Sequence, residues 1–157
     1  MLHDSACHRP RGLIVRMARP ADVDAIHEIE TEAHIRSWSR RGVASELFPS
    51  AVSTFWVAGY AADPCSIAGY ICFRIMAGEL YVLNLAVSRA LRNKGIGTWL
   101  LGLCLRLGMK KGITRAVLDV HRDNSAAVRF YRRNGFGFAC QDPGSGKIFS
   151  VMEMKFF

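Results

Sequence analysis

The sequence predicts a single domain of the α/β (α+β) class, and two observations support this. Residues 80–136 read in order as an apolar strand, a glycine turn, a long helix, a second strand and a second helix. Outside that stretch, short runs rich in β-branched and aromatic residues alternate with turn residues, which is typical of strands. The chain has 157 residues, half of them hydrophobic, and is therefore long enough to bury a core in one domain.

The first part of the chain predicts a strand and a helix after a loose end. We expect residues 1–12 to form a flexible N-terminal tail and residues 13–157 to form the folded domain. Residues 13–17 are apolar and predict a strand, and Pro20 lies where a helix is expected to begin. On that helix the apolar and acidic residues occupy opposite faces, with Ile26, Ile29 and Ala33 inward and Asp24, Glu28 and Glu32 outward.

Further strands are expected in the middle and at the end of the chain. Residues 36–49 read as a connector or a short second helix. The four additional strands are expected at residues 51–61, 66–77, 136–140 and 148–156. A turn at Asp63-Pro64 is expected to join the first two, and the turn-rich residues 141–147 are expected to join the last two.

Residues 80–136 hold the elements with the clearest boundaries. They are a strand at 80–87, a helix from Gly95 to about Lys111, a strand at 115–120, and a helix after Asp123-Asn124-Ser125. Gly112 is expected to end the first helix, and Asn134-Gly135 the second. Glycine accepts the left-handed backbone conformation that is common after the last helical turn.

The turn before the first of these helices has the chemistry of an anion site. Gly95 and Gly97 allow a tight turn and a close approach to a ligand, and the first amides of a helix have no intrahelical partner. Arg92 and Lys94 add positive charge beside the positive end of the helix dipole. This arrangement suits a pyrophosphate, although a plain strand-to-helix turn with basic surface residues would show the same pattern.

The same stretch resembles a known enzyme family. Arg92-Asn93-Lys94-Gly95-Ile96-Gly97 is similar to the acetyl-CoA loop of the GCN5-related N-acetyltransferase (GNAT) superfamily. Asn124 and Tyr131, with the alanines and the Gly-Phe around them, resemble the signature that follows this loop. The pattern is most similar to the RimI-type ribosomal-protein alanine N-acetyltransferases. The resemblance implies a central, mixed, mostly antiparallel twisted sheet of six to seven strands flanked by about four helices.

The resemblance also implies the residues that bind acetyl-CoA, the co-substrate. Backbone amides at Leu85, Ala86 and Val87 would hold the thioester and the pantetheine arm like an added strand. The residues of the pyrophosphate loop would be Arg92, Asn93, Lys94, Gly95, Ile96, Gly97 and Thr98. Asn124 would face the cofactor as well. Tyr131 stands at the family's general-acid position; its alternative role is that of an aromatic core residue.

The base is expected on the second strand of this stretch. Asp119 stands where the RimI-type enzymes carry a glutamate, and Tyr81 matches a first-strand tyrosine of the eukaryotic relatives, so the two are expected to share a water. An ion pair with an arginine is the alternative role of Asp119. His121 lies two residues on and points to the same face of the strand, which makes it a reserve base.

The acceptor is expected to be a primary amine, foremost the α-amine of a protein N-terminus. Trp38-Ser39 resembles an element that borders the acceptor groove in the RimI-type proteins, and a tryptophan packed on the sheet is the alternative. Residues 141–147 are short and contain no aromatic, unlike the tyrosine-containing segment of that family. The carboxylates considered for the cationic amine are Glu28, Glu32, Glu46 and Glu79. A small-molecule amine and a catalytically weak CoA-, RNA- or ribosome-binding module remain as alternatives.

Composition limits the partners. A net charge of +8, from 21 basic and 13 acidic residues, favours an anionic ligand. No apolar run reaches the ~18 residues of a membrane-spanning helix, and no secretory signal is visible, so a cytoplasmic monomer or dimer without membrane contact is expected. The five cysteines form no CxxC pair, and position 31 is Thr, which leaves no HExxH motif, so no metal is expected. Aromatics are not interleaved with basic residues, so no direct nucleic-acid contact is expected.

Overall fold

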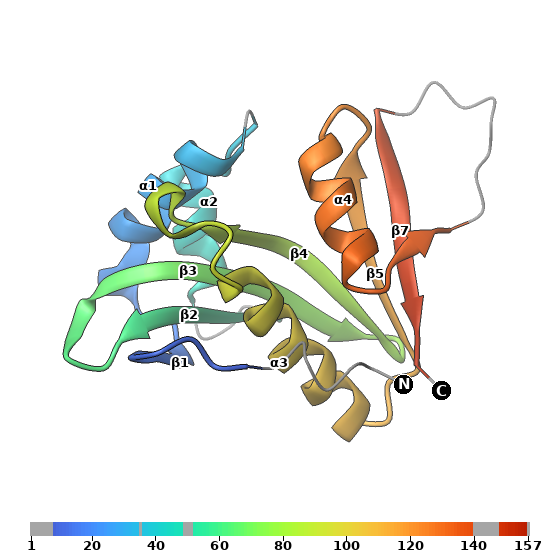
Figure 1. The fold of residues 1–157 in the computed structure, drawn as a ribbon, viewed down its shortest axis with the longest axis horizontal. Helices are drawn as coiled ribbons and strands as arrows, with labels where there is room; N and C mark the ends of the chain where they lie inside the picture. The colour runs from blue at the N-terminus through green and yellow to red at the C-terminus, as the bar shows by residue number, and fades with distance from the viewer. Residues whose placement is uncertain (1–7, 35, 49–51, 140–147, 157) are drawn as a thin grey trace.

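The computed structural model describes residues 8–34, 36–48, 52–139 and 148–156. Within them one seven-stranded sheet has the order β1-β2-β3-β4-β5-β7-β6. The strands are β1 Leu13–Met17, β2 Thr54–Tyr60, β3 Asp63–Met76, β4 Glu79–Val87, β5 Arg115–His121, β6 Gly137–Phe138 and β7 Phe149–Lys155. Neighbouring strands are antiparallel except β4 and β5, which are parallel. The sheet twists until β5 and β7 cross the direction of β1–β4 (Figure 1). The expected mixed, mostly antiparallel sheet is confirmed.

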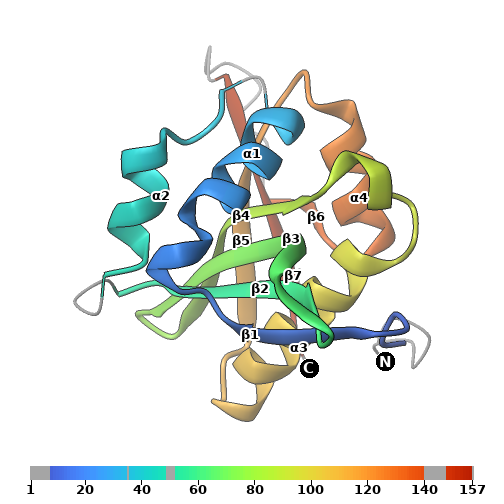
Figure 2. The same cartoon turned by 90° about the vertical axis from the view of Figure 1, so that its left-hand side faces the viewer.

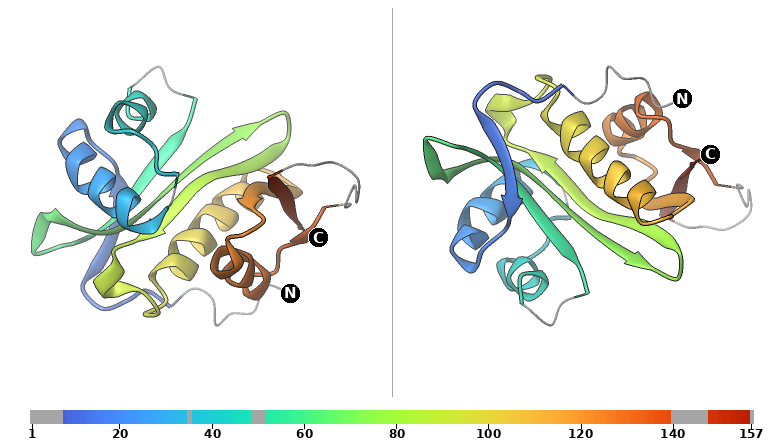
Figure 3. Two further views of the ribbon diagram at one scale, coloured as in Figure 1. Left: turned by 90° about the horizontal axis from the view of Figure 1, so that it is seen from above. Right: turned by 90° about the horizontal axis from the view of Figure 1, so that it is seen from below.

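Helices cover both faces of this sheet. They are α1 Val23–Ala33, α2 Arg40–Glu46, α3 Ile96–Lys110 and α4 Ser125–Arg133, with short 3-10 helices η2 Pro20–Asp22 and η3 Arg89–Leu91. α1 and α2 lie on one face, and α3 and α4 lie on the other (Figures 2 and 3). The four-helix expectation is confirmed for the described residues. None of these helices combines the length and the apolar character needed to span a membrane.

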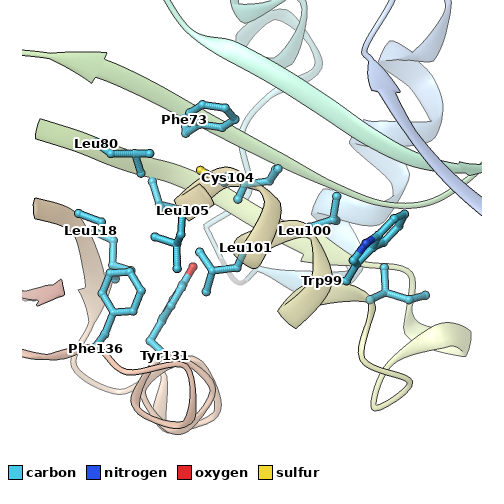
Figure 4. Packing of buried hydrophobic residues seen from close by; sticks show 14 of the residues in the cluster. Phe73, Leu80, Trp99, Leu100, Leu101, Cys104, Leu105, Leu118, Tyr131 and Phe136 are labelled. Atoms are coloured by element: carbon cyan, nitrogen blue, oxygen red, sulfur yellow. The ribbon is translucent and has the colours of Figure 1, made fainter. Parts of the chain in front are cut away.

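The layer between α3 and the sheet is an apolar core. Leu100, Leu101 and Cys104 of α3 are fully buried against Phe73 of β3 and Leu80 of β4 (Figure 4). The helix approaches β4 closely because Gly108 has no side chain, and a Cβ there would lie 2.8 Å from Cδ1 of Leu80. Burial of these side chains is the main stabilising contribution of this layer.

β4 contains one extra residue relative to β3. Cys72 pairs with Asn84 and Phe73 pairs with Val82, so Leu83 has no partner on β3. Before this bulge the side chain of Val82 points to the α3 layer, and after it that of Leu85 does. A bulge bends its strand and reverses the alternation of side chains beyond it.

Two sequence expectations need correction or fall outside the described residues. The turn after β2 lies at Ala61-Ala62 rather than at Asp63-Pro64, because Asp63 already pairs with Tyr60. Proline is tolerated near the start of a strand, so Pro64 is part of β3 rather than of the turn. Residues 140–147, with the whole of the expected final hairpin loop, lie outside the described residues, as do residues 1–7 of the expected tail. Within the remainder of that tail, Arg9 Nε donates to the carbonyl of Leu13 at 2.6 Å.

Candidate active site

β4 and β5 are paired over only part of their length. The pairing covers Leu80–Val82 of β4 and Ala116–Leu118 of β5. Beyond these residues β4 continues to Val87 and β5 to His121, and the described structure shows no pairing between the two strands there. The separation begins at the bulge, which bends β4 away (Figure 1). The edge of β4 that faces β5 therefore has backbone groups available to an extended ligand.

The start of α3 lies immediately after this part of β4 in the chain. Gly95 is its N-cap with φ +79°, and a Cβ built there would have no neighbour within 4 Å. No side chain caps this helix, and its first backbone hydrogen bond runs from the amide of Trp99 to the carbonyl of Gly95. The preceding amides, those of Ile96, Gly97 and Thr98, point out of the helix start without an intrahelical acceptor. The positive end of the helix dipole adds to them, so this turn can bind an anion.

The basic residues of the loop differ in what they contact. Arg92 donates from Nε to the carbonyl of Val87 and from an Nη to the carbonyl of Glu32, both at 3.2 Å. The amide of Arg89 donates to the carboxylate of Glu32 at 3.1 Å. Arg92 thus ties the loop to β4 and to the end of α1, while Lys94 is exposed. The loop is held in place by α1, a contact that the sequence pattern did not indicate.

Tyr131 is placed by α4 inside the apolar layer. Its residue surface is 9% exposed, and its ring packs edge-to-face against Phe130 and Phe136. The hydroxyl points toward Leu101 and Leu105 of α3 (Figure 4), and no hydrogen bond to it is found among the described residues. Burial, with a smaller effect of nearby Cys104, raises the pKa of this phenol well above its ordinary value. It therefore stays protonated at neutral pH and can donate a hydrogen bond.

Asn124 caps the helix that carries Tyr131. Its side-chain oxygen accepts a hydrogen bond from the amide of Ala127 at 3.0 Å. This bond satisfies one of the free amides at the start of α4. The expected cap is confirmed, while the expected contact of Asn124 with a cofactor stays a prediction.

Asp119 and Tyr81 lie on the same face of the sheet, the one that α1 and α2 cover elsewhere. Asp119 is exposed, and the described residues provide it with no ion pair or hydrogen bond. The Tyr81 hydroxyl donates to Glu79, which also pairs with Arg115. The hydrogen bond to Glu79, then burial, raises the pKa of Tyr81. No described contact joins Tyr81 to Asp119 directly, so their shared water stays a prediction. His121 lies 3.7 Å from a carboxylate oxygen of Asp123.

Most of the carboxylates considered for a cationic acceptor already have partners. Glu46 pairs with Arg74 at 2.9 Å, and Glu79 pairs with Arg115. Glu32 accepts from the backbone of the loop. Glu28 is exposed on α1. Within the described part of this face, Asp119 is the carboxylate left without a partner next to the separated strands.

Sequence reasoning missed Glu30, the most buried acidic residue described, which is 1% exposed. One carboxylate oxygen accepts from the amide of Trp38 at 2.7 Å. The other accepts from the side-chain amide of Asn84 at 2.9 Å and from the hydroxyl of Tyr70. Nε2 of His34 lies 3.6 Å from that second oxygen. Donors from β3, from β4 and from the segment before α2 therefore converge on one carboxylate. Glu30 and its donors Trp38, Tyr70 and Asn84 are here called the Glu30 hub.

A signal for this burial was present in the sequence. Position 30 follows Ile26 by four residues and Ile29 by one, which places it within the apolar stripe of the helix. The expectation placed Asp24, Glu28 and Glu32 outward and did not place Glu30, although acidic residues are almost never fully buried unless they are paired. A carboxylate within an apolar stripe indicates donors on the facing elements.

The described cysteines are reduced thiols of two kinds. Cys72 and Cys104 are buried and Cys65 is exposed. Burial raises the pKa of the Cys72 thiol to about 12, so it is neutral and unreactive at physiological pH. In the part of the chain that the structure covers, no group of three or more His, Cys, Asp or Glu side chains is arranged as a metal site.

Comparisons with known proteins give a consistent picture. A sequence model described as "Acetyltransferase (GNAT) family" matches residues 23–136. A spermidine N(1)-acetyltransferase of Thermoplasma acidophilum is 30% identical over 135 residues, which are 82% of this chain and 80% of that protein. A candidate ribosomal-protein-alanine N-acetyltransferase of Bacillus subtilis is 25% identical over 121 residues, 77% of this chain and 78% of that protein. The crystal structure of the PaiA N-acetyltransferase of Thermoplasma acidophilum in complex with coenzyme A superposes with a TM-score of 0.77 and 25% identity. It covers 92% of this chain, and 99% of the PaiA chain is covered.

Proposed function

This chain belongs to the acetyltransferase (GNAT) family, and from that premise we propose that it acetylates the α-amine of a protein N-terminus with acetyl-CoA as donor. The family and the enzyme class, an N-acetyltransferase, follow from the match over residues 23–136. The acceptor is the proposed part. The observation that carries the donor is the helix start at Gly95, which has no side-chain cap, next to the unpaired edge of β4. The observation that carries the acceptor is the exposed carboxylate of Asp119, which has no partner among the described residues. We take residues 13–157 as the catalytic domain and residues 1–12 as a tail.

The residues around this helix start fit the donor. Open space beside Gly95 lets a pyrophosphate approach the amides of Ile96, Gly97 and Thr98. The unpaired backbone of residues 85–87 suits the amide-containing pantetheine arm, which would lie beside β4 as an added strand. Acetyl-CoA supplies the acetyl group as a reactive thioester. The PaiA structure, similar in fold, contains coenzyme A.

Asp119 and Tyr131 have separate roles in the proton transfers of the proposed reaction. A primary amine attacks only when neutral, and an α-amine titrates near ~8, so a large fraction is already neutral near physiological pH. Asp119 is free to accept the remaining proton through a water. The Tyr131 phenol, with its raised pKa, is a weaker acid than a thiol at ~8.5. Its part in the proposal is therefore to donate a hydrogen bond to the sulfur as negative charge develops, rather than to lose its proton completely.

The face of the sheet that carries Asp119 and Tyr81 is here called the acceptor face. Its charges favour an acceptor with one cationic amine. Glu46 pairs with Arg74, and Glu79 shares Arg115 with Glu153. Asp119 stays unpartnered among the described residues. A polyamine carries several positive charges and needs several free carboxylates, whereas a peptide N-terminus needs one. The net charge of +8 also repels a polycation.

A small amine is the second candidate, because the spermidine N(1)-acetyltransferase of Thermoplasma acidophilum is 30% identical over most of both chains. The shortness of residues 141–147, which contain no aromatic, points in the same direction. The two candidates differ in the number of positive charges that the site must accommodate, so they are separable by substrate.

The test is to incubate the chain with acetyl-CoA and matched acceptors while following the release of free thiol. The acceptors are N-terminal peptides beginning with alanine, the same peptides with a blocked α-amine and a free lysine, and spermidine. We expect kcat/KM highest for the free α-amine and absent when it is blocked. Faster transfer to spermidine would move the assignment to the second candidate. Coenzyme A binding without turnover of any amine would reject the enzymatic proposal.

A further inference from the structure

The Glu30 hub lies between the two parts that an acetyl transfer must bring together. We propose that Glu30 is a positioning residue for the reaction, holding the connector at Trp38 and the bulged segment of β4 at Asn84 in one fixed arrangement. The inference rests on the proposed function, because it assigns Glu30 a part in that reaction. In this role Glu30 is buried and contacts neither substrate itself. It acts through the segments that it binds.

The hydrogen bonds of the hub account for the burial of its charge. An isolated carboxylate in an apolar layer is costly, and it is retained only when donors surround it. Here the donors are the amide of Trp38, the side-chain amide of Asn84 and the hydroxyl of Tyr70. Burial, and then the negative charge of Glu30, raise the pKa of the Tyr70 phenol, which therefore remains a donor. The carboxylate is thus already satisfied and is not available to bind a cationic acceptor.

Glu30 and its three hydrogen-bond donors come from four separate segments. Glu30 belongs to α1, Tyr70 to β3 and Asn84 to β4, while Trp38 precedes the N-cap Ser39 of α2. Asn84 is the first residue of β4 to regain a partner on β3 after the bulge. The unpaired edge proposed to hold the thioester begins at this bulge. One carboxylate therefore links the segment before α2, on the acceptor side, to the strand on the donor side.

A purely structural role makes a different prediction. Glu30→Gln replaces one acceptor oxygen of the hub by an NH2 donor, so a purely structural carboxylate predicts a loss of stability with the kcat of the folded protein unchanged. A positioning role predicts loss of turnover in a protein that still folds and still binds the donor. Displacements of about 1 Å in a catalytic arrangement can reduce turnover about 100-fold.

The decisive variant is Glu30→Gln, which keeps the shape and one acceptor oxygen but removes the charge. We expect kcat to fall about 10- to 100-fold, with the Kd for coenzyme A changed less than about twofold. Thermal unfolding and coenzyme A titration are measured on the same samples. Asp24→Asn is the matched control, because it makes the same chemical change on the exposed side of α1 and should leave kcat unchanged.

A double variant tests whether the kcat lost in Glu30→Gln can be restored. Asn84→Asp combined with Glu30→Gln exchanges the donor and the acceptor between the two positions and restores one buried carboxylate. We expect at least a tenfold recovery of kcat over Glu30→Gln alone. Should Glu30→Gln fail to fold, Tyr70→Phe removes one donor with little change in volume, and a fall in kcat at constant coenzyme A affinity is expected from it.

The outcomes distinguish a failure of the positioning role of Glu30 from a failure of the proposed function. Unchanged kcat in a folded Glu30→Gln protein would overturn the positioning role and leave the proposed function intact. Loss of coenzyme A affinity in parallel with kcat would also overturn it, because the effect would then be a general loss of structure. An unaltered chain that acetylates no amine would instead reject the proposed function, and this inference with it.

Discussion

The two faces of β3 and β4 are covered by helices in different ways. On the α3 face, Phe73 and Leu101 belong to a core whose buried members are almost all apolar. On the α1 face the cluster also contains aliphatic residues, but Glu30 and Asp22 are buried beside it. Apolar burial gives stability without fixing directions, while hydrogen bonds to a buried charge fix directions at a cost in desolvation. We infer that the first face mainly stabilises the fold and the second mainly positions the segments on the acceptor side.

Tyr131→Phe is expected to have the largest effect and would sharpen this comparison. Among the described residues, Tyr131 carries the only hydroxyl in the buried part of the α3-side core. Removing it should lower kcat about 100- to 10,000-fold if the hydroxyl acts on the leaving sulfur. The melting temperature and the affinity for coenzyme A should stay close to those of the unaltered chain. Normal turnover would make Tyr131 an ordinary aromatic of the core.

Leu101→Ala should have the largest effect on stability. Leu101 is fully buried between α3, the sheet and Tyr131. We expect a loss of about 2–5 kcal/mol in the free energy of unfolding, measured by denaturant titration. Arg106, exposed on the same helix, provides a control through Arg106→Ala. A loss below that of the control would contradict the assignment of stability to this face.

Asp22→Asn should have a smaller effect, confined to the polar face. Burial would raise the pKa of Asp22, but hydrogen bonds from Arg16 and from the amide of Arg19 outweigh it and lower the pKa. The stability due to ionised Asp22 is therefore present at neutral pH and is lost as the pH falls through the lowered pKa. We expect Asn to cost about 1–3 kcal/mol at pH 7 and less in acid, where the two proteins converge.

The exposed pair of Asp24 and Arg40 is the counterpart of that buried pair. Both side chains are largely in solvent, at 76% and 63% exposure. Asp24→Asn should therefore leave the unfolding midpoint unchanged at physiological ionic strength. A loss equal to that of Asp22→Asn would mean that burial does not separate the two ion pairs.

The smallest effect is expected from the titration of the enzyme's own groups on turnover. The rate is expected to rise as the acceptor amine loses its proton near ~8 and then to level off. Because the pKa of Tyr131 is raised, its titration should not add a falling limb below pH 10. A decline between pH 8 and 10 in steady-state kcat, with the protein still folded, would contradict the protonated state assigned to Tyr131.

The donor side was predictable from sequence because its contacts are local. Gly95 begins its helix, Asn124 caps the next, and the strands around them match their expected limits to within one or two residues. Each depends on residues a few positions away. The burial of Glu30 depends on Tyr70 and Asn84, which are 40 and 54 residues away. The apolar stripe of α1 indicates that position 30 is buried, but no local pattern contains the donors that make burial of its carboxylate possible.

Other features were also not predicted, because local sequence patterns do not contain them. The contacts of Arg92 with the carbonyls of Val87 and Glu32 require α1 to lie against the loop. A basic residue next to a glycine turn suggested an anion ligand or a place on the surface, but no contact with α1. The bulge at Leu83 is invisible in an almost continuously apolar run, because alternation cannot be followed where nearly every residue is apolar. The ion pair considered for Asp119 is not found among the described residues. The alternatives for Tyr131 concern reactivity, which neither pattern nor packing determines.

The bulge in β4 separates two properties of that strand, its bend and the faces of its side chains. Leu83 adds one position that β3 does not match, while Val82 and Asn84 pair with the successive residues Phe73 and Cys72. Deleting Leu83 would therefore give a regular strand in which Leu85 still faces α3 and Ala86 still faces α1. What such a deletion would remove is the bend that parts β4 from β5, so the opening between these two strands depends on one additional residue.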